Sequence, residues 1–209
     1  MKNALISYCK KAIEQPDFFN RCQSQFEDVI PEIITEIKKS FFVPRTTKTN
    51  LKPFFERFGI ELPDDIKDYI NLFWHTSIFG SYDCDKQNEN GGYYKFDEGL
   101  VLFPVLKYNC KRDDDVFFQE YGVYALTEEL YEDFEEEEGA SFQTDLVKIV
   151  KDYICIGWTE YSAYKILYKI STGEIYLESM MEDRVADDKP IASSLSKLIN
   201  KLYFLKKSC

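Results

Sequence analysis

Tyr153-Ile154-Cys155-Ile156-Gly157-Trp158 opens the stretch of sequence that decides the fold of this chain. It is a short apolar run, rich in aromatic and β-branched residues, and it predicts a buried strand. From Tyr164 to Ile170, isoleucine and tyrosine alternate with lysine and leucine, which predicts a second strand with two distinct faces. Ser171-Thr172-Gly173 supplies a turn, and Glu174 to Glu178 returns as the partner strand.

A helix is predicted to close this hairpin. Pro190 lies where a helix can begin, because proline is tolerated in the first turn. The apolar residues that follow repeat at helical spacing: Ile191, Leu195, Leu198, Ile199, Leu202 and Leu205. A hairpin with one amphipathic helix is a packing unit, and none of its residues has a catalytic pattern. It therefore predicts the fold and not the function.

The rest of the chain predicts a single α+β domain over residues 1–209, with a largely antiparallel or mixed sheet flanked by helices. Residues 1–50 form an N-terminal helical extension, with helices near 3–14 and 24–39, and residues 51–209 form the core. Further helices are predicted at 51–58, 63–74, 128–134 (capped by Thr127) and 142–150. Further strands are predicted at 77–82, 93–96, 100–106 and 116–124, with a polar loop at 83–92 and a charged loop at 108–115.

The length and cysteine pattern favour a protein without metals or disulfides. A domain of 209 residues buries roughly 70% of its unfolded surface, so its core suffices for stability. The six cysteines are scattered and form no C-x-x-C pair, which disfavours zinc and indicates reduced thiols. Apolar residues between Lys2 and Lys10 are too few for a secretory signal, and no apolar run approaches the ~20 residues of a membrane span. We expect a cytoplasmic protein with no membrane insertion.

The net charge of −11 is concentrated in the middle of the chain. Residues 61–145 carry 22 acidic against 6 basic side chains, whereas residues 1–60 and 146–209 are slightly basic. Nucleic-acid binding depends on cationic side chains, so a direct DNA or RNA role is disfavoured. A basic protein partner is favoured, because opposite charges speed encounter. The alternative, that the acidic surface only keeps the protein soluble, stays open.

No constellation of residues predicts catalysis, a cofactor or a metal site. Asp83 to Asn88 is similar to the start of a calcium loop, but it lacks the glycine at the sixth position and the glutamate at the twelfth, Tyr94. Asp113-Asp114-Asp115 lacks ligand spacing. His75 is the only histidine and follows Trp74 on a predicted helix, without a serine or cysteine motif. We therefore expect a non-enzymatic protein.

Two segments resemble the SUKH superfamily. Gly59-Ile60-Glu61-Leu62-Pro63-Asp64-Asp65-Ile66-Lys67-Asp68-Tyr69 resembles the helix that precedes the sheet in that superfamily. Ser171 to Glu178, followed by Ile191 to Leu202, resembles the closing hairpin and helix of its Syd branch, which interacts with SecY. The similarity spans residues 54–205.

This resemblance implies an α+β fold and no enzymatic activity. Syd-like proteins present an acidic concave surface to basic cytosolic loops of the SecY translocon, whereas many other SUKH members are immunity proteins that block toxins, often nucleases. The longer N-terminal helices, the charged insert at 107–120 and the Glu135–Glu138 run have no Syd counterpart. They favour the immunity branch.

Our leading hypothesis is therefore an immunity protein that captures a basic toxin domain electrostatically and occludes its active site. Trp158 is expected to be a packing anchor at the rim, although it could equally be a core residue that ends its strand. The acidic residues expected to contact the partner are Asp83, Asp85, Glu98, Asp113, Asp114, Asp115, Glu132, Asp133, Glu135, Glu136 and Glu160. The alternatives are a Syd-like partner of SecY and a carboxylate-dependent hydrolase.

Overall fold

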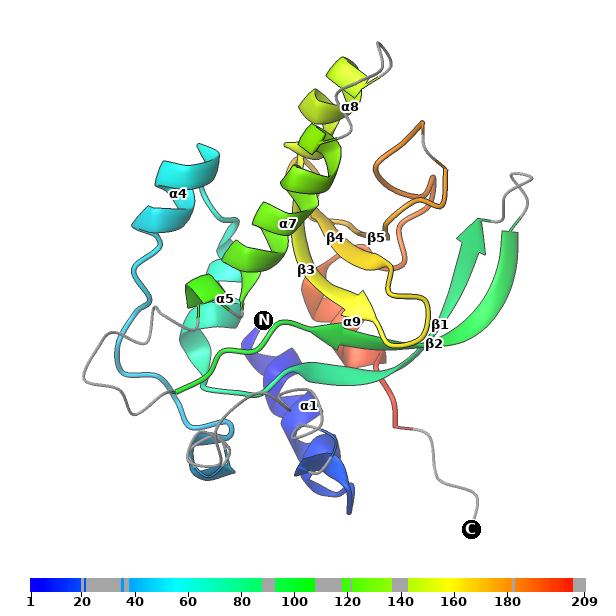
Figure 1. Cartoon of the computed structure of the whole chain (residues 1–209). Coiled ribbons are helices and arrows are strands. Elements are labelled where there is room, and N and C mark those ends of the chain that lie inside the picture. Colours follow the sequence, from blue (N-terminus) through cyan, green and yellow to red (C-terminus); the bar gives the residue numbers. More distant parts are fainter. Residues whose placement is uncertain are drawn as a thin grey trace.

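The computed structural model describes residues 1–19, 21, 35, 38–87, 93–107, 118–120, 122–136, 143–181 and 183–204. It has an α+β fold with one five-stranded antiparallel sheet in the order β1-β2-β3-β4-β5 (Figure 1). The strands are β1 (Ile78–Gln87), β2 (Tyr93–Leu102), β3 (Tyr153–Thr159), β4 (Lys165–Lys169) and β5 (Ile175–Leu177). The helices are α1 (Lys2–Ile13), α4 (Lys52–Phe58), α5 (Asp64–Leu72), α7 (Val123–Glu136), α8 (Gln143–Val150) and α9 (Leu195–Lys201).

The sheet is a meander with a long segment inserted between β2 and β3. β1 and β2 pair along ten residues each, from Ile78 opposite Leu102 to Gln87 opposite Tyr93. β3 and β4 pair with a bulge between Cys155 and Gly157. A β-carbon on Gly157 would overlap the carbonyl oxygen of Val101 on β2, so only glycine allows the two strands to approach this closely.

Side-chain alternation in β3 and β4 separates two hydrophobic cores. Ile154, Ile166 and Tyr168 belong to the larger core, to which α1, α5 and α9 contribute their buried faces. Cys155 and Leu167 point to the opposite face and pack in a smaller core with side chains of α7 and α8. α7 lies along β3 in Figure 1, and this placement decides which of its residues face solvent.

The hairpin is confirmed, but its closing helix begins later than the sequence predicts. β4 and β5 occupy nearly the expected residues, and Gly173 in the expected turn has a positive φ of 75°. α9 begins at Leu195, where the Ser194 hydroxyl accepts a hydrogen bond from the Lys197 amide (3.3 Å). The prediction of a start at Pro190 is wrong because Ile191 and Ala192 instead exchange backbone hydrogen bonds with Ile175 of β5.

The described polar residues near the paired ends of β1 and β2 lie in strands and not in loops. β1 continues through Gln87, and residues 97–99 lie inside one uninterrupted β2. The predicted loop at 83–92 is therefore wrong for residues 83–87, because the ten-residue ladder satisfies their backbone groups despite their polarity. The segment with similarity to a calcium loop is thus largely strand.

Three local predictions near α5 and α7 are also wrong. α5 ends at Leu72, and His75 lies on an extended segment that bridges to Val105. Residues 118–120 are helical, so the strand predicted at 116–124 is absent there. Thr127 is fully buried inside α7 and does not cap it, because the helix begins at Val123.

The N-terminal region joins the main core. α1 matches the prediction, and its Leu5 and Tyr8 are buried in the larger core. Most of the helix predicted at 24–39, and the charged loop at 108–115, lie outside the described residues. Among the described residues, no helix has the length and apolar character needed to cross a membrane.

Candidate partner-binding surface

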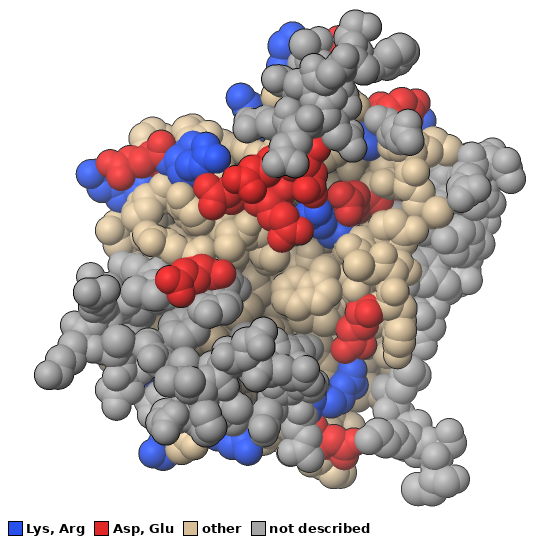
Figure 2. Space-filling model, viewed as in Figure 1, with Lys and Arg blue, Asp and Glu red and all other residues tan. Residues whose placement is uncertain are grey.

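α7 has one apolar and one acidic face. Val123, Leu130 and Tyr131 are buried against the sheet and the neighbouring helix. Glu128, Glu129, Glu132 and Asp133 follow helical spacing on the other side, and the last three are exposed. We call these four residues the acidic face of α7. Figure 2 shows acidic side chains gathered over this helix.

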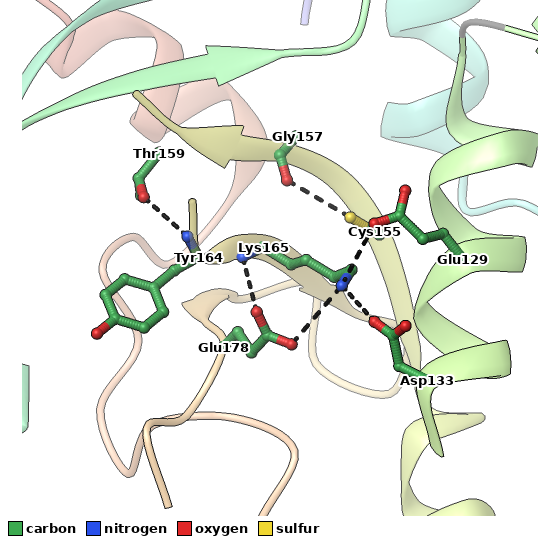
Figure 3. A network of polar contacts seen from close by, with 8 residues as sticks. All are labelled: Glu129, Asp133, Cys155, Gly157, Thr159, Tyr164, Lys165 and Glu178. Atoms are coloured by element: carbon green, nitrogen blue, oxygen red, sulfur yellow. Dashed lines mark hydrogen bonds and ion pairs between the residues drawn. The ribbon is translucent and has the colours of Figure 1, made fainter. Parts of the chain in front are cut away.

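Lys165 of β4 connects this face to the sheet through ion pairs. Its Nζ lies 2.5 Å from Asp133 Oδ2, 3.6 Å from Glu129 Oε1 and 3.9 Å from Glu178 Oε1 (Figure 3). The Lys165 amide also donates to Glu178 Oε2 (3.0 Å). Only 15% of the Lys165 side chain is exposed, against 64% for Glu129 and 51% for Asp133. One buried cation therefore holds three carboxylates in place.

The charge of Lys165 is stabilised by this arrangement. Burial by itself lowers the pKa of Lys165, but the hydrogen bond to Asp133 and the charges of Glu178, Asp133 and Glu129 outweigh it. The net pKa lies above the ordinary lysine value, so the side chain is fully protonated at neutral pH.

Arg57 of α4 holds the other end of the face. Its Nε lies 2.9 Å from Glu128 Oε1, and this pair connects α4 to α7 across 71 residues of sequence. Two anchors along one helix restrict the orientation of its carboxylates. A surface ordered before it meets a partner loses less conformational entropy on binding.

The structure does not unite all predicted contact residues. Asp83 and Asp85 are exposed on β1, which is separated from β3 by β2, while α7 packs on β3. Asp83 accepts a hydrogen bond from the Tyr203 hydroxyl (2.9 Å). Of the remaining predicted residues, Asp113, Asp114 and Asp115 lie outside the described residues, as do the side chains of Glu98, Glu135 and Glu136.

Trp158 lies opposite Lys165 in the β3–β4 pairing, and Glu160 directly follows the end of β3. Glu160 accepts from Arg21 Nη2 with both carboxylate oxygens (3.0 and 3.2 Å). Trp158 is half-buried against the larger core, whereas Tyr161, three residues further along the chain, has 81% of its surface accessible. Glu160 and Tyr161 line an open hollow of about 940 Å³, together with Phe18 and Phe79.

His75 is a core residue. It is 2% exposed, and its Nδ1 donates to the Thr76 carbonyl oxygen (2.7 Å) while its ring contacts Tyr69 edge-on. Burial lowers the pKa of His75 to about 4, so the ring is neutral at pH 7. No group of three or more histidine, cysteine, aspartate or glutamate side chains within the described ranges could hold a metal ion.

Sequence reasoning missed the cations that organise these acids. In the sequence, Lys165 is an ordinary polar residue of an alternating strand. Arg57 is an ordinary basic residue in the last turn of a helix. Their partners lie far away in the sequence, so no local signal could identify them. Comparison with models of known protein families, with curated proteins and with solved structures finds no match to this chain. The resemblance to the SUKH superfamily therefore stays a prediction.

Proposed function

We propose that this chain is a non-enzymatic binding protein that captures a basic protein partner through the acidic face of α7. The observation that supports the proposal most is the anchoring of this face: Lys165 and Arg57 hold an exposed row of carboxylates on a helix packed against the sheet. The carboxylates of Glu129, Glu132 and Asp133 are exposed on one side of a helix (Figure 2), an arrangement suited to contact with a macromolecule.

The expected partner is a basic bacterial toxin domain, which makes the chain an immunity protein. The excess of acidic residues in 61–145 favours a cationic partner, because opposite fields steer encounter and disfavour wrong partners. The resemblance to SUKH immunity proteins points to a nuclease or another toxin with a basic active site. On a nuclease, a row of carboxylates takes the place of phosphate charges, so binding there blocks access of nucleic acid.

Charge reversal of one exposed residue tests this proposal. Glu132→Lys changes the charge of the acidic face, and Glu14→Lys makes the same change at the exposed C-terminal end of α1. The probe is the variable C-terminal domain of the secreted toxin expected in the adjacent reading frame. At about 50 mM salt, E132K should weaken association at least tenfold and E14K less than twofold.

Salt dependence provides the contradicting outcome. Exposed charges are screened beyond about 8 Å at physiological ionic strength, so wild-type association should weaken as salt rises. Association that is indifferent to salt, or equal losses in E132K and E14K, would exclude the acidic face of α7 as the binding surface. Protection of cells that co-express the toxin gives an independent measurement.

SecY cytosolic loops are the second candidate partner. The β4–β5 hairpin followed by α9 has the order expected from the resemblance to the Syd branch. Those loops are basic as well, so charge alone does not separate the candidates. A pull-down that compares SecY loop peptides with toxin domains does, because only the cognate partner should be retained at physiological salt.

A further inference from the structure

The outer edge of β1 changes character along its length. β1 is the first strand of the sheet, so β2 pairs with only one of its sides. In an antiparallel strand, alternate residues direct their N–H and C=O groups to opposite sides. The backbone N–H and C=O groups of Ser81 point away from β2, because both form hydrogen bonds with the backbone of Tyr203 (2.8 and 3.1 Å). By the same alternation, backbone groups also point away from β2 at Phe79, Asp83, Asp85 and Gln87.

The chain itself covers the first part of this edge. The Tyr8 hydroxyl donates to the Phe79 carbonyl oxygen (2.8 Å) and accepts from the Phe79 amide (3.0 Å). Ser81 is covered by Tyr203. From Asp83 to Gln87, no backbone partner other than β2 occurs among the described residues. The β1–β2 hairpin extends away from the labelled helices here (Figure 1), so the part of the chain that the structure describes leaves the hydrogen-bonding groups of this edge unpaired.

The side chains on this open edge select what can pair with it. Asp83 and Asp85 are two residues apart, so both point to the same face, and both are exposed. If a second copy of β1 paired there, its aspartates would lie against these, and like charges across strands are destabilising. A net charge of −11 adds to the repulsion between copies. The edge therefore disfavours self-association and favours a cationic strand.

We infer that the edge of β1 from Asp83 to Gln87 binds an extended basic segment of a partner protein as an added strand. Its backbone pairs with the outward groups of Asp83 and Asp85, and lysine or arginine side chains at alternate positions lie opposite the two aspartates. Main-chain hydrogen bonds supply affinity in this mode of recognition, and alternate side chains supply specificity. The inference rests on the proposed function in one respect, the basic character of the partner.

A proline substitution separates backbone pairing from charge. The N–H of Asp85 faces outward, so Asp85→Pro removes a donor from the open edge and leaves the bonds to β2 intact. Asp85→Asn removes the charge and keeps the donor. The probe is an acetylated eight-residue peptide of alternating lysine and threonine, and its control carries N-methylated lysines, which keep the charge and lose the donors.

Binding is measured by nuclear magnetic resonance titration of the isotopically labelled full chain. We expect the peptide to slow hydrogen exchange at the amides of Asp83 and Asp85. D85P and the N-methylated peptide should each weaken binding at least tenfold, whereas D85N should weaken it two- to fivefold and reduce its salt dependence. If D85P does not fold, wild-type amide protection and the N-methylated peptide still decide the matter.

Three outcomes would overturn the inference: no binding of the peptide to the wild-type chain, equal binding by D85P, or a dimer in sedimentation with the β1 edge protected. Each is distinct from failure of the proposed function. A chain whose toxin affinity falls with E132K but not with D85P keeps its function and loses this edge as its binding element.

Discussion

The ammonium group of Lys165 on β4 lies 2.5 Å from the carboxylate of Asp133 on α7. These residues are 32 positions apart in sequence, and their contact fixes the acidic face of α7 relative to the sheet. The pair is asymmetric, since Lys165 is largely buried while Asp133 is half exposed. The lysine therefore depends on its partners more than they depend on it.

Removing the charge of Lys165 should destabilise the protein. Lys165→Met keeps most of the side-chain packing and removes the cation 3.9 Å from Glu178, whose side chain is 23% exposed. We expect the free energy of unfolding in urea to fall by about 1–2 kcal/mol, less than for a fully buried pair because Asp133 and Glu129 are half exposed. Lys148→Met, which breaks an exposed pair with Asp145, should change it by less than about 0.5 kcal/mol. Equal effects would contradict the anchoring role.

His75 should make stability depend on acidity. Its pKa falls from 6.5 to about 4 on folding, mainly through burial, so protons bind preferentially to the unfolded chain between these values. The contribution of neutral His75 to the free energy of unfolding is fully present above pH 6.5. About 3 kcal/mol of it is lost as the pH falls to about 4. Urea unfolding of wild type and His75→Gln at several pH values checks this. The difference between their curves should vary over that window and stay constant above it; parallel curves would show that His75 does not titrate on unfolding.

Two glycines should differ in their tolerance of alanine. At Gly157 an added β-carbon meets the Val101 backbone, which cannot move without breaking the β2–β3 pairing. We expect Gly157→Ala to cost about 3 kcal/mol or more, or to prevent folding. Gly59 ends α4 with a φ of 70°, but nothing lies within 4 Å of its added β-carbon. Gly59→Ala should therefore cost only the left-handed backbone penalty of about 1–2 kcal/mol in thermal or urea unfolding.

The hydrogen bonding of the β1 edge at Phe79 should depend on the hydroxyl group of Tyr8. Tyr8→Phe leaves the buried N–H and C=O groups of Phe79 without their partner, at a cost of about 1–3 kcal/mol. Tyr203→Phe removes an exposed bond to Asp83 and should cost less than about 1 kcal/mol. Hydrogen exchange at the Phe79 amide provides the specific measurement, since it should accelerate in Y8F alone. An unchanged rate would show that Tyr8 does not cover the edge.

The spacing of apolar residues correctly predicted the elements in which that spacing stays constant from end to end. β3, β4 and β5 occupy nearly the expected residues, and α4 ends at Phe58 as expected. α+β character follows from these elements. Such predictions succeed because the apolar face of each element is written within ten or so consecutive residues.

Local pattern failed where pairing overrides composition. Asp83, Asp85 and residues 97–99 have the polarity of a loop, yet they lie in the longest strand pair. Thr127 has the character of a helix cap, yet it is buried in mid-helix. In the first case the neighbouring strand, and not the segment itself, supplies the stabilising contacts.

The sequence by itself determined the acidic middle of the chain and the hairpin that organises the sheet, because charge and side-chain period are properties of consecutive residues. Only the tertiary structure decided which carboxylates are anchored. Lys165, Arg57 and Arg21 reach their partners across 32, 71 and 139 residues of sequence. Such contacts exist only once sheet and helices have packed, since packing alone brings these side chains within the range of a hydrogen bond.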